Sequence, residues 1–180
     1  MSGLRAFMLP TSHPANGQEL SMIRRLAFLC APLAFAALLS ISIPRTWADS
    51  DDGIRRVKSA VPMQEAITRI KADIAAKKIK FFSEIDQSRL AADAGIELRP
   101  STLLVFGNPP LGTQFITSNP NAGLDWPVRL LLTQDDNGDV WAVWTDFEWI
   151  ARRHRIGDRV AQFQMATSVV NSITSTIAAK

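Results

Sequence analysis

Two apolar runs joined by an Asn-Gly turn constrain the fold of this chain more than any other stretch. Residues 128–134 and 140–145 are rich in Val, Leu and Trp, and they flank the polar sequence Asp-Asp-Asn-Gly-Asp at 135–139. Asn-Gly between two such runs is the strongest short-range signal for a tight turn, so we expect an antiparallel β-hairpin. Side chains alternate along a strand, and Trp141 and Trp144 should therefore point to opposite faces of the sheet.

The rest of the chain alternates strand-like and helix-like segments. The patterns predict strands at 53–60, 79–86 and 101–106, and helices at 62–78, 87–94, 113–118, 147–155 and from about 159 onward. Asp146 and Asp158 are placed to cap the last two helices. Residues 101–106 are apolar on both faces, so we expect this strand inside the sheet with cover on each side. The sequence thus predicts an α+β domain with a mixed or antiparallel sheet of about five strands packed with helices.

The first 48 residues have the composition of an export leader. Residues 22–25 are a short basic start, residues 26–43 are almost wholly apolar, and Thr46-Trp47-Ala48 offers small residues for cleavage before Asp49. These are the parts of a secretory signal peptide, although the apolar run also reaches the lower limit for an uncleaved membrane anchor. We expect residues 1–21 to be an extension ahead of the true start at Met22, residues 22–48 to be a signal peptide, and residues 49–180 to be the folded domain.

Removing the leader changes the charge balance and the cysteine count. The whole chain carries 20 basic and 17 acidic residues, but four of the basic and one of the acidic residues precede Asp49, which leaves 16 of each. A neutral domain gives no reason to expect a nucleic-acid partner. The single cysteine, Cys30, lies in the leader, so the domain has no disulfide, thiol catalyst or cysteine metal site. We expect a periplasmic or secreted protein that contacts the membrane only through its signal segment.

Several short motifs occur in an order that resembles one known family. They are Phe82-Ser83-Glu84-Ile85-Asp86, the run at 97–109, Gly112-Thr113, Gly123-Leu124-Asp125 followed by Pro127, and Arg153-His154. Together they resemble the DUF302 family, a TT1751-like α+β domain whose function is uncharacterised. The resemblance covers residues 57–178 and implies a single domain with no established activity, catalytic set or cofactor. Three positions depart from the family pattern, because Gln87 replaces a usual His, Trp126 replaces a usual Leu and Thr145 replaces a usual Asn.

One histidine and two aspartates are the candidates for a metal or catalytic site. Asp86, Asp146 and His154 carry groups that divalent ions accept as ligands. The alternative is that the aspartates cap helices and that His154 fills the edge of the core, since no His-x-x-x-His spacing occurs. The chain also lacks a Gly-x-Ser-x-Gly motif and a Ser-His-Asp order, so a hydrolase triad has no support.

Aromatic residues indicate a second kind of site. The domain holds four tryptophans, at positions 126, 141, 144 and 149, and a face of the hairpin that is not needed for the core could border an apolar pocket. We expect a small apolar or aromatic ligand to contact Trp126 and Trp144, with Arg99, Asn108 and His154 as polar contacts.

Three functional hypotheses follow from these observations. The first is a non-catalytic binding or accessory protein, for which we predict no cofactor. The second is a hydrolytic or metal-dependent enzyme that uses Asp86, Asp146 and His154. The third is a structural homodimer joined through a polar, nearly uncharged face of the last helix, formed by Ser168, Asn171, Ser172, Thr174 and Ser175.

Overall fold

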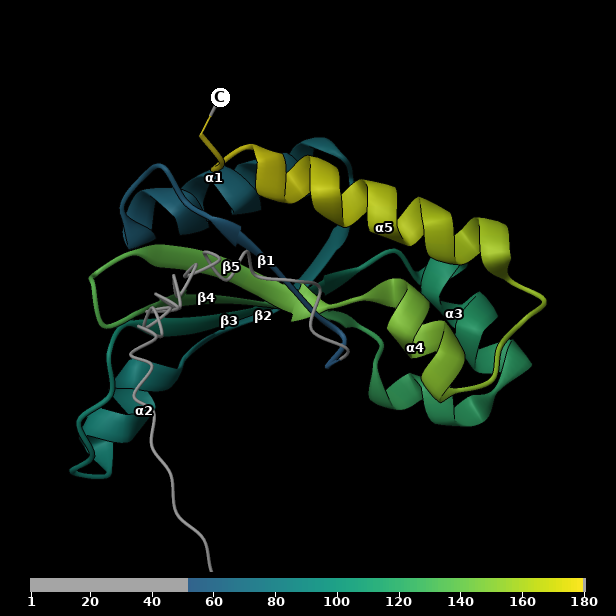
Figure 1. Cartoon of the computed structure of the whole chain (residues 1–180), viewed down its shortest axis with the longest axis horizontal. Coiled ribbons are helices and arrows are strands. Elements are labelled where there is room, and N and C mark those ends of the chain that lie inside the picture. The colour runs from purple at the N-terminus through teal and green to yellow at the C-terminus, as the bar shows by residue number, and fades with distance from the viewer. Residues whose placement is uncertain (1–51, 180) are drawn as a thin grey trace, which may run out of the picture. The chain divides into compact units, whose positions relative to one another are not determined.

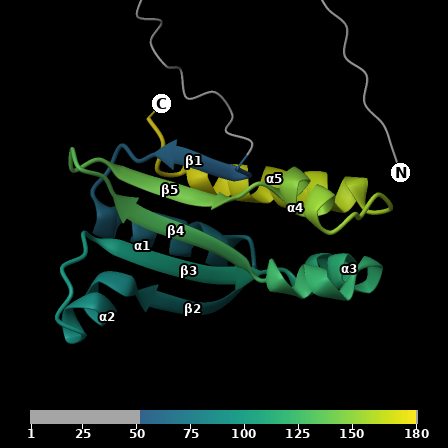
Figure 2. The same cartoon turned by 60° about the horizontal axis from the view of Figure 1, so that its bottom comes forward.

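The computed structural model describes residues 52–179, in which a single antiparallel sheet organises the chain (Figures 1 and 2). The strands are β1 (Ile54–Lys58), β2 (Lys80–Asp86), β3 (Ser101–Gly107), β4 (Val128–Gln134) and β5 (Val140–Thr145), arranged in the order β1-β5-β4-β3-β2. Each pair of neighbours is antiparallel. The predicted hairpin is β4–β5, and the predicted α+β class with a sheet of about five strands is confirmed.

Two long helices cover one face of the sheet. Both α1 (Met63–Ala76) and α5 (Val160–Ser175) lie above the strands in Figure 1. Because α1 connects the two edge strands, β1 and β2, it crosses the sheet from one edge to the other. The shorter elements are α2 (Gln87–Asp93), α3 (Pro109–Ser118), the 3-10 turn η1 (Pro120–Leu124) and α4 (Phe147–Arg153). Figure 2 shows α3 and α4 beyond the same end of the sheet.

The core lies between this face and the two long helices. Leu104 and Leu130 point toward the helices and are 0% exposed, whereas their strand neighbours Leu103 and Leu131 are half-buried. The same alternation buries Trp144 and leaves Trp141 half-buried, so the two tryptophans face opposite sides as predicted. From α1, residues at helical spacing complete the layer: Ala66, Ile67, Ile70 and Ile74.

The opposite face of the sheet has only partial cover. α2 lies on this side and packs against β3, but α2 has no buried residue, and Leu90 is 59% exposed. A cross-strand row on this face is half-buried or exposed: Ile85, Leu103, Leu131 and Val143. The expectation that residues 101–106 are packed on both sides is therefore wrong for much of β3, because α2 is short and follows β2 at one end of the sheet.

Two helix starts differ from the predicted ones. α3 begins at Pro109 instead of residue 113, because prolines fit the first turn of a helix, where N–H groups have no helical partner. α5 begins at Val160, and Asp158 does not cap it. Asp158 instead accepts a hydrogen bond from the Ser118 hydroxyl at 2.9 Å, which connects the approach to α5 with the end of α3.

The polar face predicted for the last helix also needs correction. Thr174 is 1% exposed, and its hydroxyl donates to the Val170 carbonyl at 3.0 Å. A threonine can be buried in this way because its own helix satisfies the hydroxyl. Val160 is 59% exposed at the first position of α5.

The predicted leader lies outside the described residues. This applies to the extension 1–21, to the signal peptide 22–48 and to the cleavage before Asp49. Within residues 52–179, every helix is too short or too polar to cross a membrane.

Candidate apolar ligand site

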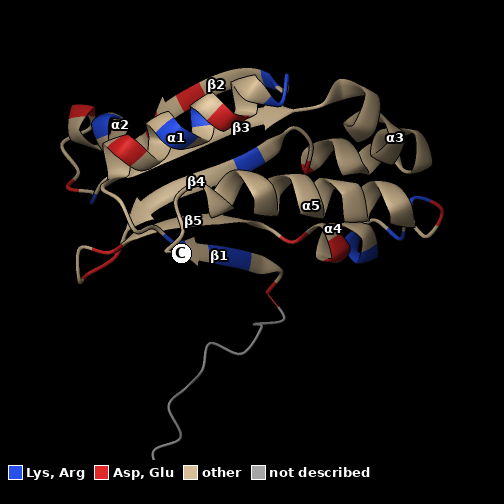
Figure 3. Cartoon of the chain, turned by 90° about the horizontal axis from the view of Figure 1, so that it is seen from above, with Lys and Arg blue, Asp and Glu red and all other residues tan. Residues whose placement is uncertain are grey.

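An apolar pocket with a volume of about 270 Å³ lies between the end of β3, the start of β4, α3 and α5. Four aromatic side chains line it: Phe106, Phe115, Trp126 and Phe147. α5 adds Met165, Ala166, Val169 and Val170. Since α5 carries no charged residue along its length, this side of the pocket is neutral (Figure 3).

Trp126 forms a wall of the pocket because two glycines make room for its indole. A Cβ atom at Gly112 would lie 1.7 Å from Trp126 Nε1, and a Cβ atom at Gly107 would lie 3.1 Å from the same nitrogen. Phe82 contacts the indole edge-on, with 6.1 Å between ring centroids. The register of β2 shifts between Phe81 and Ser83, so Phe82 sits on a bulge, which redirects a side chain. The indole is thus held by β2, β3 and α3.

The pocket has few polar groups and no unpaired charge. Lys77 is its one charged lining residue, and Lys77 Nζ contacts the two carboxylate oxygens of Asp73 at 2.7 and 2.6 Å. Asn108 precedes α3, but its side chain makes no capping hydrogen bond, which leaves its amide available. Such a lining suits an uncharged molecule with few hydrogen-bonding groups, because a buried unpaired charge would be costly.

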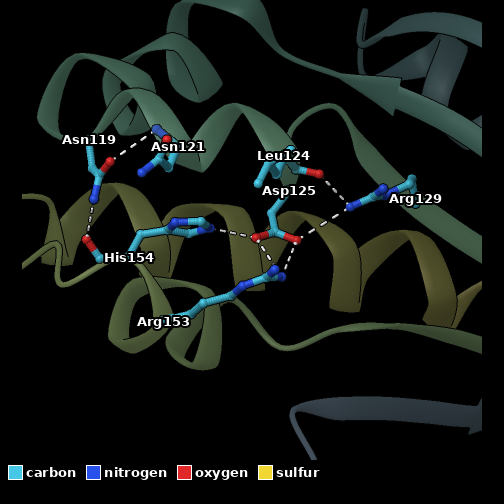
Figure 4. Close-up of polar contacts among 7 residues, drawn as sticks. All are labelled: Asn119, Asn121, Leu124, Asp125, Arg129, Arg153 and His154. Atoms are coloured by element: carbon cyan, nitrogen blue, oxygen red, sulfur yellow. Dashed lines mark hydrogen bonds and ion pairs between the residues drawn. The ribbon is translucent and has the colours of Figure 1, made fainter.

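The residue that precedes Trp126 in the sequence, Asp125, carries a buried carboxylate, and Figure 4 shows its polar contacts. The side chain of Asp125 is 5% exposed, and its Oδ2 lies 2.6 Å from His154 Nε2. Arg153 Nη1 donates to both carboxylate oxygens at 3.2 Å, and Arg129 Nη2 donates to Oδ1 at 3.3 Å. Charge-assisted hydrogen bonds of this kind are stronger than those between neutral groups. The four residues form what we call the Asp125 cluster.

His154 also contacts the other end of η1. Asn119 Nδ2 donates to the His154 carbonyl at 2.8 Å, while Asn119 Oδ1 accepts from the Asn121 backbone N–H at 3.0 Å. His154 is itself the C-cap of α4. His154, directly after α4, therefore contacts the residues at the beginning and at the end of η1, as Figure 4 shows.

The pocket brings together two of the five residues predicted to contact a ligand, Asn108 and Trp126. Trp144 points into the core and is 6% exposed, and the ring of His154 is buried against Asp125. Arg99 precedes β3 and forms an ion pair with Asp136 in the hairpin turn. Arg99, Trp144 and His154 are consequently not part of the pocket lining.

The structure does not bring the three predicted metal ligands together. Asp86 ends β2 and Asp146 follows β5, and these strands run in opposite directions, so the two carboxylates lie at opposite ends of the sheet. Each caps a helix, with Asp86 accepting from the Arg89 N–H and Asp146 from the Glu148 N–H. The bond from Arg89 lowers the pKa of Asp86. No three His, Cys, Asp or Glu side chains in residues 52–179 are grouped to hold a metal ion.

Gln87, the position where the family pattern usually has a histidine, is also remote from His154. Its Oε1 accepts a hydrogen bond from the Ser101 hydroxyl at 2.8 Å, at the start of β3. His154 lies at the end of α4, which follows the opposite end of the sheet. The fold therefore forms no site shared by these two positions.

Asp125 and the α5 lining are the parts of this region that the sequence patterns did not predict. A signal for Asp125 existed, because Gly123-Leu124-Asp125 and Arg153-His154 both belong to the motifs that carried the family resemblance. The α5 residues gave no such signal, since apolar residues at helical spacing are equally typical of a core face.

These features define a small α+β domain with two long helices on one face of an antiparallel sheet and an apolar pocket at one end. The family model described as "Domain of unknown function DUF302" matches residues 55–179, and the chain belongs to this DUF302 family. A solved structure titled "Crystal structure of uncharacterized conserved protein DUF302 from Bacillus stearothermophilus" is similar, with a TM-score of 0.64. The match covers 70% of this chain and 98% of that chain at 12% identity, so it shows the shared fold alone.

Two curated relatives are longer proteins. The "Fluoride-specific ion channel FluC 1" of Brucella suis biovar 1 (strain 1330) is 36% identical over 107 residues, which are 59% of this chain and 42% of that protein. The protein of the same name from Brucella abortus biovar 1 (strain 9-941) is also 36% identical over 107 residues, which are 40% of its length. The chain thus spans about two fifths of the length of these relatives.

Proposed function

We propose that this protein binds a small, uncharged apolar or aromatic molecule and acts as a binding or accessory protein rather than as a catalyst. The pocket of about 270 Å³ beside Trp126 is the observation that carries the proposal. Ligand pockets are mostly apolar clefts with a few placed polar groups, and their volumes start at about 300 Å³. A volume just under that range suits a molecule of one or two rings.

Two groups at the pocket can contribute hydrogen bonds to such a ligand. They are the side-chain amide of Asn108 and the indole N–H of Trp126, neither of which makes a hydrogen bond within residues 52–179. Both can donate, so a ligand with an acceptor oxygen on an aromatic ring would satisfy them. The aromatic lining then accounts for affinity, and the two donors account for orientation.

The test is a titration with 2-naphthol, a neutral two-ring molecule with one oxygen, followed in ¹H–¹⁵N spectra. We expect saturable binding that shifts the Trp126 indole resonance. Trp126→Ala removes the wall and should raise the Kd by about tenfold or more. Trp141→Ala is the matched control, because Trp141 lies on the other face of the sheet and should leave the Kd unchanged. Equal affinity in both variants would contradict the proposal.

We also propose that the protein is exported to the periplasm or secreted. The basic start, apolar run and small-residue cleavage sequence within residues 22–48 support this proposal. Intact mass measurement of the protein isolated from periplasmic extract should give a chain that begins at Asp49. A full-length chain found in the membrane fraction would instead indicate an anchor.

A second candidate is an accessory role beside an ion channel. Its support is that proteins named as fluoride-specific ion channels are 36% identical to this chain over about two fifths of their length. If the role is shared, cells that lack this protein should become more sensitive to fluoride, and the complete protein should restore tolerance. Unchanged growth at all fluoride concentrations would remove this candidate.

The homodimer remains a prediction that can be tested directly. Ser168, Asn171, Ser172 and Ser175 are exposed on α5 and form an uncharged strip. Sedimentation should show two chains for a dimer, and Asn171→Arg should reduce it to one chain. Catalysis through Asp86, Asp146 and His154 is not proposed, because the fold separates these side chains.

A further inference from the structure

We propose that the contact between Asp125 and His154 is a latch that holds Trp126 in place as the wall of the ligand pocket. Both would then be positioning residues for ligand binding, although neither lines the pocket. This inference rests on the proposed function of the pocket. It assigns to the Asp125 cluster the role of positioning Trp126, whereas the proposed function assigns no role to this cluster.

The first observation is the burial of the pair. The side chains of Asp125 and His154 are each 5% exposed, and their atoms Oδ2 and Nε2 lie 2.6 Å apart. A buried carboxylate is costly unless it is paired and hydrogen-bonded, so the position of Asp125 is restricted to where its partners are. Arg153 and Arg129 add further contacts to the same carboxylate. The cluster therefore holds Asp125 in one place.

The second observation is that Asp125 is joined directly to Trp126 and that the chain is held on both sides of the indole. Before it, the Asp125 N–H donates to the Ala122 carbonyl at 3.0 Å, which ends η1. After it, Arg129 Nη2 reaches back to the Leu124 carbonyl at 2.6 Å. Trp126 thus lies inside a short closed segment, and His154 fastens that segment to α4.

The third observation is that the indole packs directly against two glycines of β3 and α3. A Cβ atom at Gly112 would lie 1.7 Å from Trp126 Nε1 and one at Gly107 3.1 Å from it, so the indole fills the space beside both backbones. A displacement of the Asp125 backbone would therefore press the indole against α3 or move it into the pocket. Asp125 is joined in sequence to Trp126 and not to the α5 residues that line the pocket, so the latch acts on the Trp126 wall.

The experiment compares Asp125→Asn and His154→Ala with the intact protein. We measure the Kd for 2-naphthol, the ¹H–¹⁵N indole resonances of Trp126 and Trp141, and the Tm. Both variants should raise the Kd by about tenfold. They should also move or broaden the Trp126 resonance while the Trp141 resonance stays in place. Arg153→Ala, whose side chain is 45% exposed, removes part of the cluster and should have a smaller effect in the same direction.

Ile70→Val is the matched control for a general loss of stability. Ile70 is 0% exposed in α1 and does not line the pocket, so this variant should lower the Tm without changing the Kd or the Trp126 resonance. If Asp125→Asn or His154→Ala fails to fold, the remaining variant and Arg153→Ala are measured in the same way and test the same proposal.

The outcomes separate the latch from the proposed function. If the protein does not bind 2-naphthol but the Trp126 resonance moves in the cluster variants, the proposed latch stands and the proposed ligand class is wrong. A Trp126 resonance that stays unchanged in every folded cluster variant overturns the latch, whatever the protein binds. A Kd that rises equally in Ile70→Val also overturns it, because the effect then follows stability alone.

Discussion

Gly112 lies in the first turns of α3, and the Trp126 indole occupies the space that a side chain at this position would fill. The family pattern that the chain resembles usually has Leu where this chain has Trp126. The indole is larger than a Leu side chain, so in this protein it needs the space beside Gly112. The fit of the Trp126 side chain thus depends on the absence of a side chain at Gly112. Cores respond to changes of this size because they are packed without spare volume.

Gly112→Ala should destabilise the protein by about 1–3 kcal/mol, because the new Cβ overlaps the Trp126 ring. In a Trp126→Leu background the same change should cost little or even stabilise α3, since Ala is a better helix former than Gly. Chemical denaturation of the four proteins of this double-mutant cycle measures the coupling. Equal costs in the two backgrounds would show that the overlap is relieved elsewhere.

Asp135 is a second position where one contact sets a measurable property. The Trp141 indole N–H donates to Asp135 Oδ2 at 2.9 Å, and this bond, followed by the backbone N–H groups of Asp139 and Asn137, lowers the pKa of Asp135 below its usual 3.8. A carboxyl whose pKa is lower in the folded state contributes stability above the unfolded-state pKa. That stability is lost as the pH falls through the folded-state pKa.

We therefore expect the Trp141 indole resonance to titrate with a midpoint below 3.8. Asp135→Asn should abolish this titration and remove part of the loss of Tm at low pH. A midpoint at or above 3.8 would mean that the hydrogen bond is not kept in solution.

The helices α2 and α4 begin in the same way but differ in what they bury. Asp86 caps α2 and Asp146 caps α4, each through a bond from a backbone N–H in the first turn. α4 buries Phe147 and Ile150, whereas α2 buries none of its residues. Arg55 Nη2 also contacts Asp146 Oδ2 at 3.1 Å, which connects α4 with the edge strand β1. Loss of the two caps should therefore have different consequences.

Asp146→Ala should lower the free energy of unfolding by about 1–2 kcal/mol, because it removes a cap from a helix that is part of the core. Asp86→Ala should increase amide exchange in α2 and leave the global stability nearly unchanged. Denaturant unfolding and native-state hydrogen exchange distinguish the two effects. A comparable loss of global stability in Asp86→Ala would show that α2 unfolds together with the sheet.

On the scale of the whole molecule, one hydrophobic core joins the elements of residues 52–179. Its buried members run from Ala66 on α1 to Ile177 beyond α5, and they join the two long helices to one face of the sheet. The sheet has two edges, β1 and β2, and one partly covered face, so the core is a single layer between helices and sheet.

A chain that begins at Asp49 should consequently fold in a cooperative, two-state transition and should bind 2-naphthol as the longer protein does. Calorimetry and the naphthol titration of both proteins check this expectation. A non-cooperative transition in the shorter chain would mean that the preceding residues contribute to the fold.

The local elements were predictable because their causes are local. The Asn137-Gly138 turn specifies the β4–β5 hairpin, and the spacing of Ile67, Ile70 and Ile74 specifies the buried side of α1. The start of α3 was misplaced because Pro109 and Pro110 are equally typical of turns and of the first turn of a helix. Both the α+β class and the family followed from patterns within the chain itself.

The candidate site was predictable only in part, since its walls come from segments far apart in the sequence. Asn108 and Trp126 could be singled out as a polar and an aromatic residue beside turns. Neither the Asp125–His154 contact nor the bulge that aims Phe82 at Trp126 follows from a periodic pattern, because both depend on how separate elements approach each other.

The sequence by itself thus determined the pattern of secondary structure, the class of fold and the absence of cysteine from residues 52–179. Periodicity and turn chemistry act over a few residues, so they can be read from the chain directly. The tertiary structure alone decided that His154 pairs with Asp125 and lies apart from Asp86, and that a pocket opens between α3, α5 and the end of the sheet. The order and direction of the strands decide which distant residues become neighbours and which lie at opposite ends of the sheet. That order depends on packing across the whole domain.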